Sequence, residues 1–299
     1  MFDPKMRRLA TALSFFLLAP LPGALAQTAP DIVITGVRPE QTQAFVQQLA
    51  AISPMADQLP RWDSTVCTSV AGMPARQAQF LADRIAQRAA AVGLQPGGPG
   101  CVANVAIFVT GESDTFARRL FEQDRTLFAY YQSDGISTLG QQALEDFLST
   151  PRAVRWWHVS ETFGADGLAL SGDTSIGGLE NAPAVRSYGS RLSGNTREDL
   201  MQAIVIIDAR RVQGAQLAAL ADYVALVALA QINPHAQTAE YPTILNLFNG
   251  AQVNASGPTE LTQWDQAFLD ALYKSTRNAS NQRAQQNEIA RRMNGGNQS

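Results

Sequence analysis

The stretch Ala75–Gly111, ARQAQFLADRIAQRAAAVGLQPGGPGCVANVAIFVTG, decides the fold class of this chain. Residues 75–94 repeat apolar side chains at helical spacing, which predicts an amphipathic helix. Its expected apolar face consists of Phe80, Leu81, Ile85, Ala89 and Val92. The Gly- and Pro-rich residues 95–100 end that helix, and the continuous apolar run 101–111 is typical of a strand buried on both faces. A helix followed by a buried strand predicts an α/β layer.

The same alternation continues outward from this stretch. The segment RWDSTVCTSV (61–70) is a candidate strand before the helix. Further helices are expected at 113–131 and 138–149, and further strands at 153–163 and 203–208. The run DIVITG (31–36), before all of these, resembles a β-strand. Thr196 resembles a helix cap. The pattern predicts an α+β or α/β fold, with a mixed sheet flanked by helices, in a single domain of residues 27–275. Residues 276–299 are expected to form a polar, partly disordered tail.

Residues 1–26 have the pattern of a secretory signal peptide. Basic residues precede the apolar run Leu9–Gly23, and Ala24-Leu25-Ala26 forms a small-x-small cleavage site. We therefore expect a mature chain that starts at Gln27 and lies in the periplasm of a Gram-negative bacterium. A membrane anchor is the alternative, but the apolar run is short and is broken by two prolines.

The charge of the chain argues against nucleic acid as a partner. The formal net charge is −3, and residues 1–26 carry three basic residues and one acidic residue, so their removal leaves −5. No later run of 18 consecutive apolar residues occurs, so no integral membrane segment is expected after signal cleavage.

The chain has two cysteines, Cys67 and Cys101, and both lie in the expected mature protein. An exported chain with two cysteines is expected to join them in a disulfide. Such a bridge would close a loop of 34 residues and stabilise the fold by roughly 3–4 kcal/mol in the chain-entropy model. A metal-binding or catalytic thiol is the alternative, although neither cysteine lies in a C-x-x-C motif.

The expected strand VRWWHVSET (154–162) contains four candidate binding residues. Strand alternation puts Trp156 and His158 on one face, and Arg155, Trp157 and Glu161 on the other. His158 has the chemistry of a general base or ligand-binding group, or it is a hydrogen-bonded structural residue. Arg155 and Glu161 have the charges to bind an anion and a cation, or they form a surface pair.

Several common enzyme classes find no support in the sequence. The chain has no G-x-S-x-G nucleophile elbow and no P-loop, and the Gly-rich segment 93–100 lacks the spacing of a dinucleotide site. The chain has two histidines, His158 and His235, so at most two imidazole ligands are available for a metal site. We therefore expect no metal and no cofactor, and assign no catalytic residue.

The order of segments in the C-terminal half resembles that of zincin metallopeptidases. The apolar strand AIVIIDARRV is followed by the helix ALADYVALVALAQINP (219–234), then by PTILNLF and by LTQWDQAFLDALY. In zincins that helix carries H-E-x-x-H, whose two imidazoles bind zinc one helical turn apart. Here Asp222, Tyr223 and Leu226 occupy the positions of the first His, the Glu and the second His. The resemblance therefore implies a degenerate zincin-like scaffold without peptidase activity.

Two further resemblances concern location. The segments DIVITGVRP, CVANVAIFVT, VRWWHVSET, VIIDARRV, LADYVALVALAQINP and LTQWDQAFLDALY resemble a group of exported alphaproteobacterial proteins. That resemblance implies a location in the cell envelope and supplies no activity. DIVITGVRP also resembles the mature N-terminus of TonB-dependent receptors, but the chain lacks the length and strand repeats of those barrels. A first strand plus a turn is the simpler interpretation.

These observations favour a non-catalytic binding protein for a peptide or another envelope protein, while the oligomeric state stays open. The expected cleft lies between the helix 220–232 and the strand 154–161, lined by Trp157, His158 and Asp222. One alternative is a hydrolase with a non-standard active site, in which His158 is the base and Glu161 or Asp222 its partner. Another is an assembly factor whose polar tail contacts a partner. His235, next to a proline in a loop, is left open as a second histidine for a site with His158.

Overall fold

The computed structural model describes residues 32–130, 135–170 and 193–295 of the chain. Strands and helices alternate in the first part of the described chain, and helices dominate its end. The elements, in chain order, are α1 (Pro39–Leu49), β1 (Thr68–Ala71), α2 (Ala75–Ala91), β2 (Val105–Thr110), α3 (Ser113–Gln123), η1 (Arg125–Phe128), β3 (Ile136–Ser137), α4 (Gln141–Ser149), β4 (Val154–Gly164), β5 (Thr196–Asp208), α5 (Leu217–Leu229), η2 (Ile244–Leu247), β6 (Phe248–Asn249), β7 (Gln252–Val253), α6 (Gln263–Lys274) and α7 (Gln282–Met293).

A mixed sheet of five strands, in the order β1-β2-β5-β4-β3, forms the centre of the described residues. β1, β2 and β5 run parallel, whereas β4 is antiparallel to both of its neighbours, β5 and β3. The parallel strands β1 and β2 are joined through α2, which is the crossover that parallel pairing requires. The predicted mixed sheet flanked by helices is confirmed.

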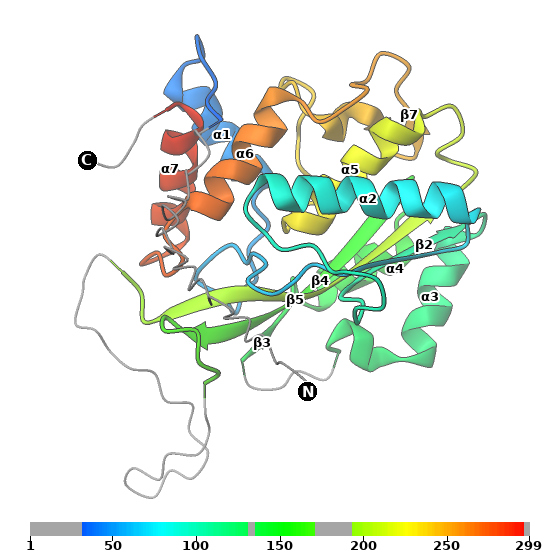
Figure 1. Ribbon diagram of the computed structural model, residues 1–299, viewed down its shortest axis with the longest axis horizontal. Helices are drawn as coiled ribbons and strands as arrows, with labels where there is room; N and C mark the ends of the chain where they lie inside the picture. The colour runs from blue at the N-terminus through cyan, green and yellow to red at the C-terminus, as the bar shows by residue number, and fades with distance from the viewer. Residues whose placement is uncertain (1–31, 131–134, 171–192, 296–299) are drawn as a thin grey trace, which may run out of the picture. The chain divides into compact units, whose positions relative to one another are not determined.

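Helices cover both faces of the sheet, so its strands are apolar on both sides (Figure 1). In β5, Val205 and Ile207 belong to the core formed with α2, α5 and α6. Ile204 and Ile206 point the other way and pack in a separate core with α3 and α4. Figure 1 shows α2 and α5 side by side along one face. The α5 helix has no exposed face, because every residue from Ala219 to Leu229 is buried, as expected for a core helix.

The α2 helix confirms the amphipathic pattern but presents a narrower apolar face than expected. Leu81, Ile85 and Ala89 are buried against the core. Phe80 precedes Leu81 by one residue, so it is rotated by about 100° around the helix, and its side chain is 41% exposed. Val92 lies beyond the helix as its C-cap residue.

A disulfide joins Cys67 to Cys101, with their Cα atoms 6.0 Å apart. Cys67 directly precedes β1, and the loop that contains Cys101 leads into β2. The predicted bridge is confirmed, and neither cysteine is a free thiol. The bridge ties together the starts of two neighbouring parallel strands, where Val66 N–H also donates to Gln95 C=O at 3.0 Å.

Three expected elements differ in the structure. Residues 32–38 form no strand but lie along the last helix, where Ile34 N–H donates to Met293 C=O at 2.7 Å. The helix expected at 113–131 ends at Gln123, because the Asp124 side chain accepts from Thr126 N–H and starts the separate turn η1. Thr196 is not a helix cap but the first residue of β5, which pairs with β4 from there.

The polar segment after residue 275 contains the helix α7, which packs against α1 and α6. Ile289 and Met293 are fully buried, and the buried Gln285 side chain accepts from Leu59 N–H at 2.6 Å. The described residues 32–130, 135–170 and 193–295 belong to one compact unit. Residues 282–293 therefore lie with the rest of that unit rather than in a polar tail. A helix can look polar and still be anchored, because its amide side chains satisfy buried backbone groups.

The expected signal peptide, residues 1–26, lies outside the described residues. Among the described residues, no helix has both the length and the apolar content to cross a lipid bilayer.

Candidate functional site

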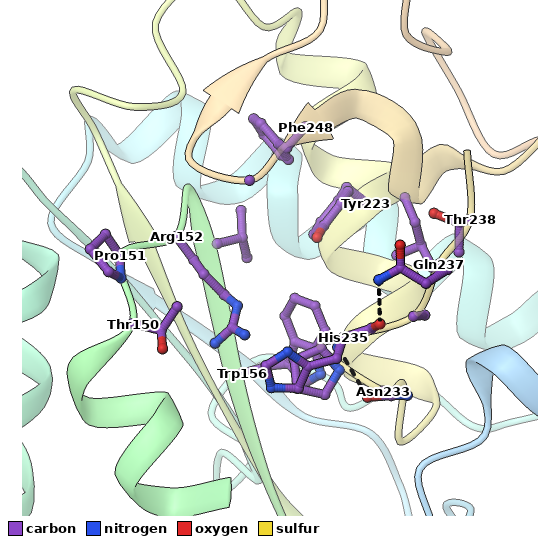
Figure 2. A pocket seen from close by; sticks show the side chains of 15 residues that line it. Thr150, Pro151, Arg152, Trp156, Tyr223, Asn233, His235, Gln237, Thr238 and Phe248 are labelled. Carbon is purple, nitrogen blue, oxygen red and sulfur yellow. Dashed lines mark hydrogen bonds between the residues drawn. The ribbon is translucent and has the colours of Figure 1, made fainter.

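A cavity of about 300 Å³ opens where β4 begins and β5 ends, and we call it the Trp156 cavity (Figure 2). Val154, which lines it, pairs with Ile207 near the carboxyl end of β5. The cavity thus lies at the carboxyl end of the central parallel strand β5. In open α/β sheets, ligands bind outside the carboxyl ends of the strands, where loops rather than regular elements meet.

The floor of the Trp156 cavity is aromatic and apolar. Trp156, Tyr223, Leu245 and Phe248 line it, and none of these side chains is more than 9% exposed. The rings touch one another, with Tyr223 5.0 Å from Phe248 and 6.1 Å from Trp156 between ring centroids. The Trp156 indole N–H donates to Ile232 C=O at 2.9 Å. This contact fixes the ring, so the floor is formed before any ligand arrives.

At the rim of the cavity, the lining residues Arg152 and His235 both contact Asp146. Arg152 Nη1 donates to Asp146 Oδ2 at 2.7 Å, and His235 Nε2 lies 3.2 Å from the same oxygen. Burial opposes ionisation of Asp146, but hydrogen bonds from Arg152 and Thr150 outweigh it and hold the pKa of this carboxyl below its usual value. Asp146 is therefore a carboxylate at neutral pH and orients both basic side chains.

The loop that carries His235 is held against α1. Asn233 N–H donates to Leu49 C=O at 2.8 Å, and the Asn233 side chain accepts from His235 N–H at 3.0 Å. Gln237 Nε2 donates to His235 C=O at 3.2 Å, as the dashed lines in Figure 2 show. This Asx-type turn positions the His235 side chain over the cavity mouth.

A second cavity of about 530 Å³, the Leu139 cavity, lies on the other side of the same loop. Asn233, Pro234 and His235 line both cavities. Apolar side chains contribute most of the remaining wall of the Leu139 cavity, namely Ala51, Ile52, Leu139 and Ala143. Residues 233–235 therefore form a ridge between two adjacent cavities.

The residues predicted from the strand 154–162 do not line the Trp156 cavity. Arg155 is 1% exposed and points toward α3 and α4, where it donates to Asp114 and, at 2.6 Å, to Phe147 C=O. Trp157 is buried on the same face, packed against Phe147 with its indole N–H bonded to Phe128 C=O. Both side chains are buried, because α3 and α4 cover the face of β4 on which Arg155 and Trp157 lie.

His158 is also buried, on the opposite face of β4 beneath α5. It hydrogen-bonds to the backbone of Val227, and its Nε2 atom has no partner. Burial lowers the pKa of His158 to about 4, and the bond to Val227 offsets only part of that effect. The imidazole is neutral and unreachable by a substrate. This position does not support the alternative in which His158 is the general base of a hydrolase, and the Trp156 cavity is lined by His235 but not by His158.

Asp222 and Glu161 lie apart from His158. Asp222 is fully buried and faces α2, where Arg84 and Arg88 each donate two hydrogen bonds to its carboxylate at 2.7–2.9 Å. Glu161 is half-buried and pairs with Ile136 of β3 on one side and Asp199 of β5 on the other. Between the helix 220–232 and the strand 154–161, Trp156 and Tyr223 pack against each other, and the space beside them is the Trp156 cavity, which Trp157, His158 and Asp222 do not line.

The residues at the zincin ligand positions have local structural roles. Leu226 is completely buried, and Asp222 anchors α5 to α2. The LT-x-x-D pattern forms a capping box at the start of α6: Thr262 accepts from Asp265 N–H, and Asp265 accepts from Thr262 N–H at 2.9 Å. Among the described residues, no group of three or more His, Cys, Asp or Glu side chains is placed to hold a metal ion.

A buried carboxyl that sequence reasoning missed lies on β5. Glu198 is 6% exposed, and its partners are the hydroxyls of Ser160 and Thr162 on β4. Burial raises the pKa of Glu198 to about 7, with Asp199 and Asp57 adding to the rise and the two hydroxyl bonds opposing it. This carboxyl therefore changes its protonation state near neutral pH.

Replacing Glu198 with glutamine is expected to remove a pH-dependent destabilisation. The unfolded chain releases this proton near the ordinary value of 4.5, whereas the folded protein keeps it up to about pH 7. Stability therefore falls as pH rises from 4.5 to 7, by roughly 2–3 kcal/mol in all. Urea unfolding of the wild-type protein and Glu198→Gln should give similar stabilities at pH 4.5 and a more stable variant at pH 8. Thr162→Val removes a hydrogen bond to the carboxylate, so the loss of stability should extend to higher pH than in the wild-type protein. Parallel pH profiles of wild type and Glu198→Gln would contradict the assignment.

The rim residues Arg152 and His235 of the Trp156 cavity could be seen in the sequence only as members of loops. Pro151 and Pro234 mark the loops, and His235 follows the mostly apolar helix 217–229. No sequence signal shows that α4, the start of β4 and the loop after α5 meet. Comparison of the chain with protein-family models, with curated proteins and with solved structures found no match. The comparisons therefore assign neither a family nor the zincin-like layout to the chain.

Proposed function

We propose that the protein is an exported periplasmic binding protein that holds a short peptide segment, free or part of another envelope protein, across the Trp156 and Leu139 cavities. The observation that carries the proposal is the pair of cavities on the two sides of the ridge 233–235. A ligand that fills both must present two bulky groups joined by a thin connection over His235. Neighbouring side chains of a peptide, joined by backbone, have that form.

The composition of the walls supports binding by shape and by a few polar contacts. Ligand sites are lined mainly by apolar and aromatic side chains with a small number of placed polar groups. The Trp156 cavity has that character, with its aromatic floor and the polar rim of Arg152, His235 and Gln237. The disulfide between Cys67 and Cys101 fits an extracytoplasmic location, where disulfides persist. The signal-peptide pattern of residues 1–26 supports the periplasm.

Binding fits the rim better than hydrolysis does. The hydroxyl side chains that line the Trp156 cavity include Thr150 and Thr238, and both are engaged as donors. Thr150 donates to Asp146 at 2.7 Å, and Thr238 donates to Asn246 at 2.8 Å. His235 contacts Asp146 but neither the Thr150 nor the Thr238 hydroxyl. These described lining residues therefore form no pair of hydroxyl nucleophile and histidine base.

Selection of peptides from a random display library on the immobilised mature protein tests the proposal. Selected peptides are then titrated by calorimetry against the wild-type protein and against two variants that fill one cavity each. Ala236→Trp fills the Trp156 cavity, and Ala143→Trp fills the Leu139 cavity. We expect each variant to weaken binding by at least about tenfold, since bulk displaces one ligand side chain worth about 1–3 kcal/mol.

The matched control is Ala90→Trp, which adds the same bulk at an exposed position of α2 that lines neither cavity. It should leave affinity unchanged. Peptides that bind equally well to all three variants would place the binding surface elsewhere and overturn the proposal. No selected peptide at all would have the same consequence.

A further inference from the structure

Two polar groups of the Trp156 cavity, Tyr223 at its base and Arg152 at its rim, offer hydrogen-bond donors to a ligand. Tyr223 is 7% exposed and lines the cavity with its hydroxyl directed into the open space (Figure 2). No described residue hydrogen-bonds to that hydroxyl. Burial raises the pKa of Tyr223, and the nearby charge of Arg152 offsets only part of the rise, so the hydroxyl stays protonated and remains a donor. The hydroxyl is therefore available to donate a hydrogen bond to a ligand in the cavity.

Arg152 supplies a positive charge beside the same space. Its Nη1 and Nη2 atoms each direct one N–H toward Asp146, at 2.7 and 3.4 Å. A guanidinium carries further N–H donors, which Asp146 leaves unused. Figure 2 shows Arg152 and Tyr223 reaching the same cavity from different elements, the loop before β4 and the helix α5, with the guanidinium of Arg152 beside Trp156. A ligand atom in this place meets two donors and an aromatic wall.

We infer that the Trp156 cavity selects a ligand that ends in a carboxylate, which accepts hydrogen bonds from Tyr223 and Arg152 while an apolar group attached to it packs on Trp156 and Phe248. The inference rests on the proposed function and narrows its ligand class. A carboxylate is the acceptor that matches an arginine fork, and charge-assisted bonds of this kind are about twice as strong as neutral ones. Asp146 is not among the residues that line the Trp156 cavity, and its carboxylate is paired with Arg152 at 2.7 Å.

A carboxylate of this kind has two sources, namely the C-terminus of a peptide or a small carboxylic acid. The Leu139 cavity favours the peptide, because it provides room for the preceding residues beyond the ridge at His235. A small acid would occupy the Trp156 cavity alone.

The test compares the tightest peptide of the display experiment as a free acid and as a C-terminal amide, with N-acetylphenylalanine as the small-acid probe. We expect the free acid to bind the wild-type protein at least tenfold more tightly than the amide. Tyr223→Phe, which keeps the ring and removes the hydroxyl, should reduce that ratio at least threefold, and Arg152→Gln should abolish it. Arg76→Gln removes the same charge from an exposed site on α2 and should leave the ratio unchanged.

The outcomes separate the inference from the proposed function. Equal binding of acid and amide, with both blocked by Ala236→Trp, would overturn the carboxylate inference and leave the peptide proposal intact. Failure of both forms to bind would overturn both. N-acetylphenylalanine binding as tightly as the peptide acid would support the carboxylate contact and identify a small acid as its source.

Discussion

Replacing Asp222 with alanine is expected to lower the free energy of unfolding by about 3–5 kcal/mol, the range for breaking a buried ion pair. The Asp222 carboxylate is fully buried and accepts from Arg84, Arg88 and Leu261 N–H. Its removal leaves both guanidinium groups without their anion at the α2–α5 contact. Urea unfolding at neutral pH measures the loss. Burial opposes ionisation of Asp222, yet the arginine hydrogen bonds outweigh it and lower its pKa.

Because the pKa of Asp222 is lowered, the pH dependence of stability provides a second measurement. A carboxyl with a lowered folded-state pKa stabilises the protein above its ordinary value of 3.8, and this stabilisation is lost as pH falls below it. The difference in free energy of unfolding between the wild-type protein and Asp222→Ala should therefore become smaller below pH 3.8. Asp83→Ala, which removes an exposed carboxylate on α2, is the matched control and should cost less than about 0.5 kcal/mol. Unchanged stability with lost peptide binding would restore Asp222 as a ligand-binding residue.

Trp157→Ala is expected to destabilise the protein by about 3–5 kcal/mol through the cavity that it leaves in the core. The Trp157 indole is 3% exposed and packs in the core on the α3 and α4 side of the sheet, with its ring centroid 6.1 Å from that of Phe147. The substitution also leaves Phe128 C=O without its donor, the indole N–H at 3.2 Å. Thermal and urea unfolding measure the loss.

The matched variant Trp157→Phe keeps an aromatic ring and removes the N–H, so its cost should be smaller than that of alanine. Peptide affinity, measured on the folded fraction of either variant, should equal that of the wild-type protein because Trp157 does not line the Trp156 cavity. A Trp157→Ala protein with normal stability and no peptide binding would show that the buried position is wrong and that Trp157 contacts ligand.

The regular elements and the disulfide could be predicted from the sequence because their causes are local. The apolar run at β2, the periodic apolar face of α2 and the mostly apolar composition of α5 each indicate how many sides of that element are buried. The pairing of Cys67 with Cys101 followed from there being two cysteines in a chain expected to be exported. Local signals also misled: the polar composition of 282–293 concealed an anchored helix, since its Gln285 and Glu288 side chains serve buried backbone groups.

The candidate site depended on contacts that local patterns do not encode. Alternation along β4 correctly put Trp157 and His158 on opposite faces, and helices on both faces then buried both of them. Asp222 left the expected site because α2 supplied two arginines from 134 and 138 residues away. Arg152, Asp146 and His235 meet because the loop after α5 folds back between α1 and α4, which follows from the packing of the whole unit. Periodicity thus determined which elements form and which side chains they bury, whereas only tertiary packing decided which loops meet and leave a cavity, since that depends on long-range contacts among elements far apart in the chain.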